Sequence, residues 1–296
     1  MTKFKRAMQL ILLAATFGIA FSFGIAVFED ARVKTVFSEF MGRANSDPTF
    51  IQQIGGVDHL FFEVPRETTR GEGNLPVFSD EAKTIPGIRG DILLTQESPF
   101  PGVPFVDWYI SYFFGGHAAL VTGPNRTLEA TGMGSSVGEI IKSSFHNGFD
   151  NDGYFSRNIV QSANGWMRRF RGQSDPHFER FNGFFRNSFV AVRTKDRGYF
   201  DENIDIAIDY ATRAYENQAL YNFIFFLNTR YRYYCTDLVS RAFREVSRTT
   251  NRRVNLNQDG FITSVNDIIL SSDVYITILL QTVNGIRHVY FLADPM

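Results

Sequence analysis

The chain has 296 residues, a formal net charge of -1 and 44% hydrophobic residues. A chain of this length and composition buries a sizeable core, so we expect a globular protein rather than a disordered one. Its 30 basic and 31 acidic residues are balanced, which gives no reason to expect nucleic acid as a partner. A single cysteine excludes an internal disulfide, and the histidines lack zinc-binding spacing, so neither a metal nor another cofactor is expected.

The first 28 residues predict the compartment. Lys3, Lys5 and Arg6 precede an uncharged apolar run from Ala7 to Phe28. This run is longer than the about 7 to 15 apolar residues of a cleaved signal peptide and matches the roughly 20 that span a bilayer. We therefore expect an N-terminal transmembrane helix that tethers the chain to the membrane, with a cleaved signal peptide as the alternative. Either way, the rest of the chain is expected outside the cytoplasm, secreted if the N-terminus is cleaved.

The remaining chain divides into a membrane-proximal segment, 29–84, and a body, 85–296. The membrane-proximal segment carries no readable motif. In the body, the apolar run after Asp91 and the segment "FVAVRT" predict strands, and "HAALVTGPNRTLEAT" predicts a hairpin with its turn at Gly123 to Asn125. A Phe- and Arg-rich stretch, 143–188, reads as an insertion.

Helical spacing follows in "ENIDIAIDYATRAYENQ" and again from Cys235 onward, and "VYITILLQTVNGIRHVYFL" predicts a closing hairpin with its turn at Asn284 and Gly285. Strands thus come both before and after the helices. This order predicts an α+β domain built around an antiparallel sheet.

Cys235 lies in "YRYYCTDLVSRAF", and its spacing to Leu238, Val239 and Ala242 places it on the inward face of the predicted helix. On this pattern alone, packing is the simplest interpretation, because free cysteine is among the most commonly buried residue types. Its position at the helix start favours chemistry instead, since unpaired N–H groups and the helix dipole stabilise a thiolate. The segment by itself leaves both interpretations open.

A cysteine nucleophile needs a neighbouring base. His117 is the best candidate, because it follows two glycines at the start of a predicted strand, where a substrate backbone has room to approach. His59, His146 and His177 have polar, turn-like surroundings that are typical of surface residues. His288 is interpreted as an ordinary residue of the last hairpin.

The motifs "GDILL", "GGHAALVTGPNRTLEATGMGSSVG", "YNFIFF" and "YYCTDLVSRAF", in this order, resemble the YiiX/YebB-like group of permuted papain-fold cysteine hydrolases. That group is related to the NlpC-type cell-wall peptidases and to lecithin retinol acyltransferase. The resemblance runs from about Gly90 to Val246 and depends on the order of the motifs, with the histidine strand ahead of the cysteine helix. It implies a permuted papain-like fold.

The resemblance also implies roles for individual residues. Cys235 would be the nucleophile, His117 the general base and Glu129 the group that orients the imidazole. Tyr221 matches a tyrosine of the family and is expected either to contribute to an oxyanion hole or to pack in the core. The hairpin pattern leaves Glu129 open, because a four-residue loop puts it on the face opposite His117, whereas a bulge or a five-residue loop restores a common face.

Three functions are consistent with the sequence. The first is a membrane-tethered, extracytoplasmic cysteine hydrolase that cleaves an amide bond, with cell-wall peptides as the expected substrate. The second uses the same residues on lipid acyl groups, which the basic, aromatic segment from Trp166 to Arg186 favours. The third is a catalytically silent envelope protein in which Cys235 belongs to the core. The "DNDG" stretch at Asp150 does not have the ligand spacing of an EF-hand.

Overall fold

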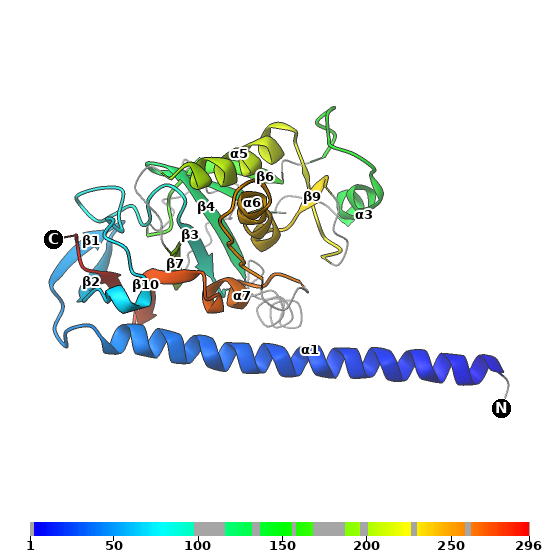
Figure 1. The fold of residues 1–296 in the computed structure, drawn as a ribbon, viewed down its shortest axis with the longest axis horizontal. Helices are drawn as coiled ribbons and strands as arrows, with labels where there is room; N and C mark the ends of the chain where they lie inside the picture. The colour runs from blue at the N-terminus through cyan, green and yellow to red at the C-terminus, as the bar shows by residue number, and fades with distance from the viewer. Residues whose placement is uncertain are drawn as a thin grey trace.

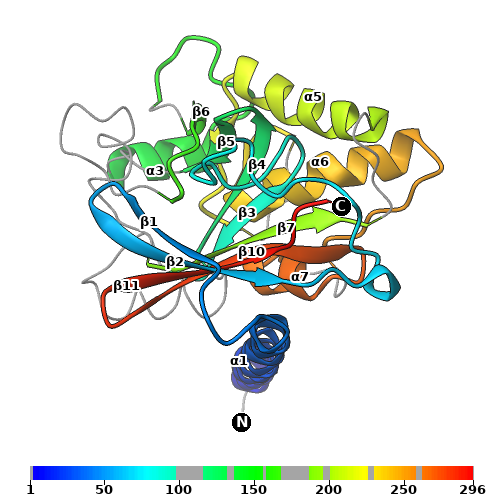
Figure 2. The same ribbon diagram turned by 90° about the vertical axis from the view of Figure 1, so that its left-hand side faces the viewer.

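A nine-stranded sheet forms the centre of the structure (Figures 1 and 2). The computed structural model describes residues 3–97, 116–131, 137–155, 158–167, 187–195, 201–225, 230–257 and 262–295. The strand order is β1-β2-β11-β10-β7-β3-β4-β5-β6. The strands are β1 (Phe50–Ile54), β2 (Val57–Val64), β3 (Ile92–Thr95), β4 (His117–Gly123), β5 (Arg126–Ala130), β6 (Ile159–Ala163), β7 (Phe189–Thr194), β10 (Val274–Val283) and β11 (Ile286–Leu292).

Helices lie on both faces of this sheet. The helices in the described part of the chain are α1 (Lys3–Gly42), α3 (Val137–Phe145), α5 (Glu202–Glu216), α6 (Cys235–Thr249) and α7 (Val265–Leu270), and a short 3₁₀ turn, η1, spans Thr68–Arg70. Helices α5 and α6 pack on each other over the β4 and β5 side, and α1 runs along the opposite face beside α7 (Figure 2). A two-stranded parallel ladder, β8 (Leu220–Tyr221) and β9 (Arg232–Tyr233), leads into α6.

The sheet is mixed, so the predicted antiparallel sheet of an α+β fold is wrong. All neighbouring strands are antiparallel except β2 and β11, which run parallel and pair from Arg287↔His59 to Leu292↔Val64. The parallel pair arises because residues 50–64, which the sequence analysis left without elements, form a hairpin that joins the edge of the last hairpin. Alternate side chains of β2, such as Phe61, are buried against the core.

The predicted N-terminal transmembrane helix is also wrong. Within the described part of the chain, no helix is both long and apolar enough to cross a membrane. The apolar run is the first part of one continuous helix that reaches Gly42, and the second part of this helix carries Glu29, Asp30 and Arg32. Its last turns bury Val33 and Phe40 in the core of the domain. The predicted contact with a membrane through this helix is wrong for the same reason.

Two further parts of the chain differ from expectation. The stretch 143–188 supplies β6, which extends the sheet beyond β5 through pairs such as Glu129↔Val160. Trp166 and Met167 are buried after β6, while residues 168–186, with most of the basic, aromatic segment, lie outside the described residues. His59 was expected at the surface but is fully buried in β2, where its Nδ1 lies 2.8 Å from the carbonyl oxygen of Val57.

Candidate active site

Cys235 is the first residue of α6, and its position is fixed by the segment around Thr263. The hydroxyl of Thr236 donates a hydrogen bond to the Thr263 carbonyl at 2.5 Å, and the Tyr234 hydroxyl accepts one from the Thr263 N–H at 3.0 Å. The apolar face of α6 continues through Leu238, Val239 and Ala242 into the core, which anchors the helix below the cysteine. As the first helical residue, Cys235 has a backbone N–H with no intrahelical partner.

His117 begins β4, and the glycine before it sets its position. Gly116 has a φ of +90°, and a Cβ added there would lie 2.3 Å from the Thr95 carbonyl oxygen and 2.6 Å from that of Glu97. No side chain fits at such distances, so only glycine allows the chain to enter β4 at this point. The carbonyl oxygen of Gly116 in turn lies 3.8 Å from the sulfur of Cys235. The close approach at Gly116 therefore places the histidine and the cysteine next to each other.

Glu129 faces His117 because β4 contains a bulge. The register shifts between Val121 and Gly123, so that Ala119 pairs with Glu129 and the carboxylate lies on the His117 face. His117 Nε2 lies 2.8 Å from Glu129 Oε2. The bulged hairpin thus makes the diagonal contact that a plain four-residue loop would prevent.

The carboxylate of Glu129 is itself held in place. Its Oε1 accepts a hydrogen bond from Thr127 Oγ1 at 2.7 Å, and Ser162 Oγ of β6 lies 3.4 Å away. Only 1% of Glu129 is exposed, so these bonds replace the water that a charged group would otherwise bind. Neither hydroxyl was predicted from the sequence to belong to the site. Because side chains alternate along β5, Thr127 lies on the same face as Glu129 and could have been predicted as its partner. The contact with Ser162 depends on the register between β5 and β6, which no local sequence pattern indicates.

Trp166 covers the imidazole and was not recognised as part of this site from the sequence. Its ring stacks on that of His117, with centroids 6.2 Å apart and planes inclined by 13°, and it also makes a T-shaped contact with Phe189. Trp166 is 2% exposed, so this contact excludes water from one face of the histidine. The isolated tryptophan in an aromatic chain gave no signal of this role.

The imidazole of His117 interacts with both proposed partners. Burial is the largest single influence on its pKa and lowers it, but the hydrogen bonds to Cys235 and Glu129 and the charges of these groups outweigh burial. The pKa of His117 is therefore raised above its usual value of 6.5. Because Nε2 contacts the carboxylate, a proton exchanged with the thiol would pass through Nδ1. This is the arrangement in which one ring nitrogen exchanges the thiol proton while the other is held by a carboxylate.

Tyr221 lies near the cysteine on β8, where it pairs with Tyr233 two residues before Cys235. Burial and, after it, the charge of Cys235 raise the pKa of the Tyr221 hydroxyl well above 10. The hydroxyl therefore stays protonated at neutral pH and keeps a proton to donate. The partly buried aromatic rings of Phe223 and Phe225, on the same segment, both contact the ring of Tyr221.

The other predicted histidines lie elsewhere. His146 follows α3 with its ring against Phe155, His288 is a partly buried residue of β11, and His177 lies outside the described residues. Within the described residues no group of three or more His, Cys, Asp or Glu side chains is arranged to hold a metal ion. The structure thus brings Cys235, His117 and Glu129 together, with Tyr221 beside them.

Comparisons with known proteins found no match. No protein-family model, no curated protein and no solved structure matches the chain. The resemblance to the YiiX/YebB-like hydrolases therefore stays a prediction from the motifs.

Proposed function

We propose that the protein is a thiol hydrolase that cleaves an amide or acyl bond through a thioester on Cys235. One observation carries this proposal: the imidazole of His117 lies 2.8 Å from the buried Glu129 carboxylate and close enough to Cys235 for the thiol to raise the pKa of the imidazole. A cysteine that merely packs in a core has no use for a base held by a buried acid. The combination is typical of an activated nucleophile.

The geometry supports a two-step reaction. His117 Nδ1 takes the thiol proton as the sulfur attacks the substrate carbonyl, and Glu129 stabilises the imidazolium that forms. The developing oxyanion would accept hydrogen bonds from the Cys235 backbone N–H and the Tyr221 hydroxyl. His117 then gives the proton to the leaving group as the C–N or C–O bond breaks. Water, deprotonated by His117, attacks the thioester and releases the acid and the thiol.

Peptide amides, such as those of the cell wall, are the substrates we propose first. This choice follows from the resemblance of the motifs to the YiiX/YebB-like hydrolases and their cell-wall peptidase relatives. A second candidate is a lipid acyl group. The observation that favours it is the set of partly exposed rings at Tyr221, Phe223 and Phe225 next to the nucleophile.

Labelling of Cys235 tests whether the enzyme proposal is right. We expect the full-length protein to react with iodoacetamide near neutral pH faster than a cysteine-containing model peptide, and His117→Ala to lose about 10²-fold or more of this advantage. His146→Ala is the matched control and should react like wild type. A wild-type thiol no faster than the peptide, and unchanged in His117→Ala, would overturn the proposal.

Mass spectrometry separates the two substrate classes. The full-length protein is incubated with peptidoglycan fragments and, in parallel, with phospholipids. New amine termini in the first reaction support the peptide substrate, whereas free fatty acid or an acylated Cys235 in the second supports the lipid. Cys235→Ser serves as the inactive control in both reactions.

A further inference from the structure

Arg287 is a buried positive charge on β11, outside the set of residues that form the candidate active site. It is 1% exposed. Alternate residues of a strand share one face, and the next two on this face, Val289 and Phe291, are apolar members of the core. An apolar side chain would continue this stripe, whereas a guanidinium loses its water there. Burial lowers the pKa of Arg287 to about 10, so the group still carries its charge at neutral pH. A charge in this position needs a specific partner.

One partner is the backbone next to Trp166. Arg287 Nη1 donates a hydrogen bond to the Met167 carbonyl oxygen at 3.0 Å, 120 residues away in the chain. Trp166 immediately precedes Met167, and its ring stacks on the imidazole of His117. A hydrogen bond to the carbonyl of residue 167 fixes the position of the chain directly after the tryptophan. Arg287 therefore acts one residue away from the ring that covers the proposed base.

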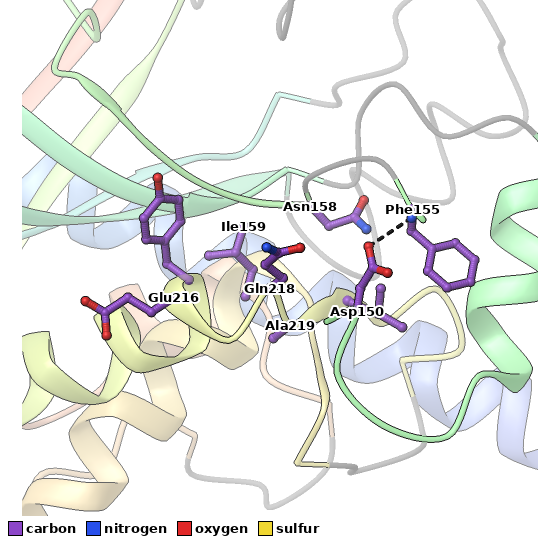
Figure 3. A pocket seen from close by; sticks show the side chains of 9 residues that line it. Asp150, Phe155, Asn158, Ile159, Glu216, Gln218 and Ala219 are labelled. Carbon is purple, nitrogen blue, oxygen red and sulfur yellow. Dashed lines mark hydrogen bonds between the residues drawn. The ribbon is translucent and has the colours of Figure 1, made fainter. Parts of the chain in front are cut away.

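The segment that carries Trp166 is held at its beginning by other contacts. Before β6, the Asp150 carboxylate accepts the N–H of Phe155 at 2.9 Å, beside a small hollow at the end of α5 (Figure 3). After β6, the backbone N–H and the side-chain amide of Asn164 donate to the carbonyl oxygens of Asn125 and Pro86 at 3.1 and 2.7 Å. These bonds fix the chain up to two residues before the tryptophan. The bond from Arg287 fixes it on the other side.

We propose that Arg287 is a positioning residue that holds Trp166 against the imidazole of His117. Apolar packing buries Trp166 and Met167 but has no preferred direction, whereas the hydrogen bond from the guanidinium is directional and determines where the chain lies. With the indole ring in place, one face of the imidazole is closed to water and the base keeps a single orientation. The effect on the thiol rests on the proposed hydrolase function, whereas the contact between the two rings does not.

The fluorescence of Trp166 measures this contact directly. The chain has two tryptophans, so Trp108→Phe in the full-length protein leaves Trp166 as the only one. A protonated imidazole that touches an indole ring quenches its fluorescence. We therefore expect the emission to rise as His117 loses its proton between about pH 5.5 and 9, and His117→Gln to abolish this transition. A Trp166 signal that does not depend on His117 would contradict the proposal.

Variants of Arg287 test its role, with thermal melting used to check that each one folds. In the Trp108→Phe protein, Arg287→Met should reduce the amplitude of the transition by about half or more and slow iodoacetamide labelling of Cys235 about tenfold. Arg287→Gln removes the charge with a shorter polar side chain and should behave in the same way if Arg287→Met does not fold. Arg287→Lys keeps a cationic donor and should restore most of both readouts. Val289→Ala is the matched control, since it removes packing from the same face of β11 and should lower only the melting temperature.

A double variant shows whether Arg287 acts through the tryptophan. Because Trp166→Ala already loses the ring contact, adding Arg287→Met should slow the labelling no further. Additive losses would overturn the proposal, as would a wild-type transition in Arg287→Met or the same losses in Val289→Ala. If Cys235 is unreactive in the wild-type protein, the hydrolase proposal fails, and the fluorescence measurement alone still tests the role of Arg287.

Discussion

His117 Nε2 and Glu129 Oε2 lie 2.8 Å apart in a site where both residues are buried. The contact crosses a hairpin diagonally and exists because one extra residue in β4 turns the carboxylate toward the histidine. A buried acid held by two hydroxyls cannot turn away to solvent. His117 is therefore fixed in one orientation before any substrate arrives, which is what a base acting on a thiol requires.

The raised pKa of His117 predicts a pH-dependent contribution to stability. A histidine whose folded-state pKa lies above its unfolded value of 6.5 stabilises the fold fully below that value, and the contribution is lost as the pH rises through the folded pKa. The difference in unfolding free energy between wild type and His117→Gln should therefore shrink as the pH rises from about 5.5 to 9. Urea unfolding at a series of pH values measures it.

A second buried histidine, His59, does not affect this comparison. Burial first, and then the charge of Arg287, lower its pKa, so its own effect has the opposite sign. It is present in both proteins and cancels in the difference. A difference that stays constant or grows with pH would contradict the assignment.

Glu129→Gln should lower the pKa of His117 while keeping the shape of the side chain. The substitution removes a charge and weakens a hydrogen bond that favour the imidazolium, and burial then acts with less opposition. NMR titration of ¹³C-labelled histidine rings reads this pKa directly. We also expect alkylation of Cys235 to slow by about 10²-fold. Glu202→Gln, at the exposed start of α5, is the control that should leave both readouts unchanged.

Tyr221→Phe distinguishes an oxyanion donor from a packing residue. If the hydroxyl binds the oxyanion, kcat should fall by about 10²-fold or more with little change in KM. Tyr290→Phe on β11 is the control, because it removes a hydroxyl far from Cys235. A variant that changes only the melting temperature would assign Tyr221 to the core.

Gly116→Ala should disrupt both the fold and the site. The added methyl group meets two backbone carbonyls at a positive φ, so the start of β4 must move, at an expected cost of about 1–3 kcal/mol for the backbone alone. Gly123→Ala, where an added Cβ meets nothing within 4 Å, is the matched control. Urea unfolding with iodoacetamide labelling measures both effects, and similar behaviour of the two variants would refute the steric explanation.

A buried ion pair between Asp91 and Arg193 predicts a large stability effect away from the site. Both side chains are fully buried, and Arg193 bonds both carboxylate oxygens at 2.8 and 2.7 Å. Asp91→Ala would leave the buried guanidinium without its counter-charge, which should cost about 3–5 kcal/mol in the free energy of unfolding. Asp205→Ala breaks an exposed pair with Arg89 and should cost less than about 1 kcal/mol. Comparable losses in the two variants would contradict this ranking.

Local patterns predicted the parts of the fold that local forces determine. Helix α6 begins at Cys235, as the apolar spacing indicated, because that spacing reflects which side chains of the helix pack on the sheet. The last hairpin turns at Asn284 and Gly285, whose positive φ angles of 52° and 80° explain why those residue types occur there. Such features depend on a few neighbouring residues.

Features that depend on distant contacts could not be predicted in the same way. The strand character of 57–64 was missed because its partner, β11, is the last strand of the chain. No particular residue type marks the bulge in β4, so the sequence could not show on which face of the hairpin Glu129 lies. The apolar N-terminal run was assigned to a bilayer because hydropathy alone does not show that the same helix continues to Gly42 and packs on the domain.

The parallel pairing of β2 with β11 also has a consequence for the order of folding. Arg66 Nε donates a hydrogen bond to the Ala293 carbonyl, 227 residues later in the chain. During synthesis, the β1–β2 hairpin must wait until β11 has been made before its partner strand exists, and closing so long a loop is slow. Until then the exposed edge of β2 is open to pairing with other chains, so removal of the last ten residues should cause aggregation rather than a shorter folded domain.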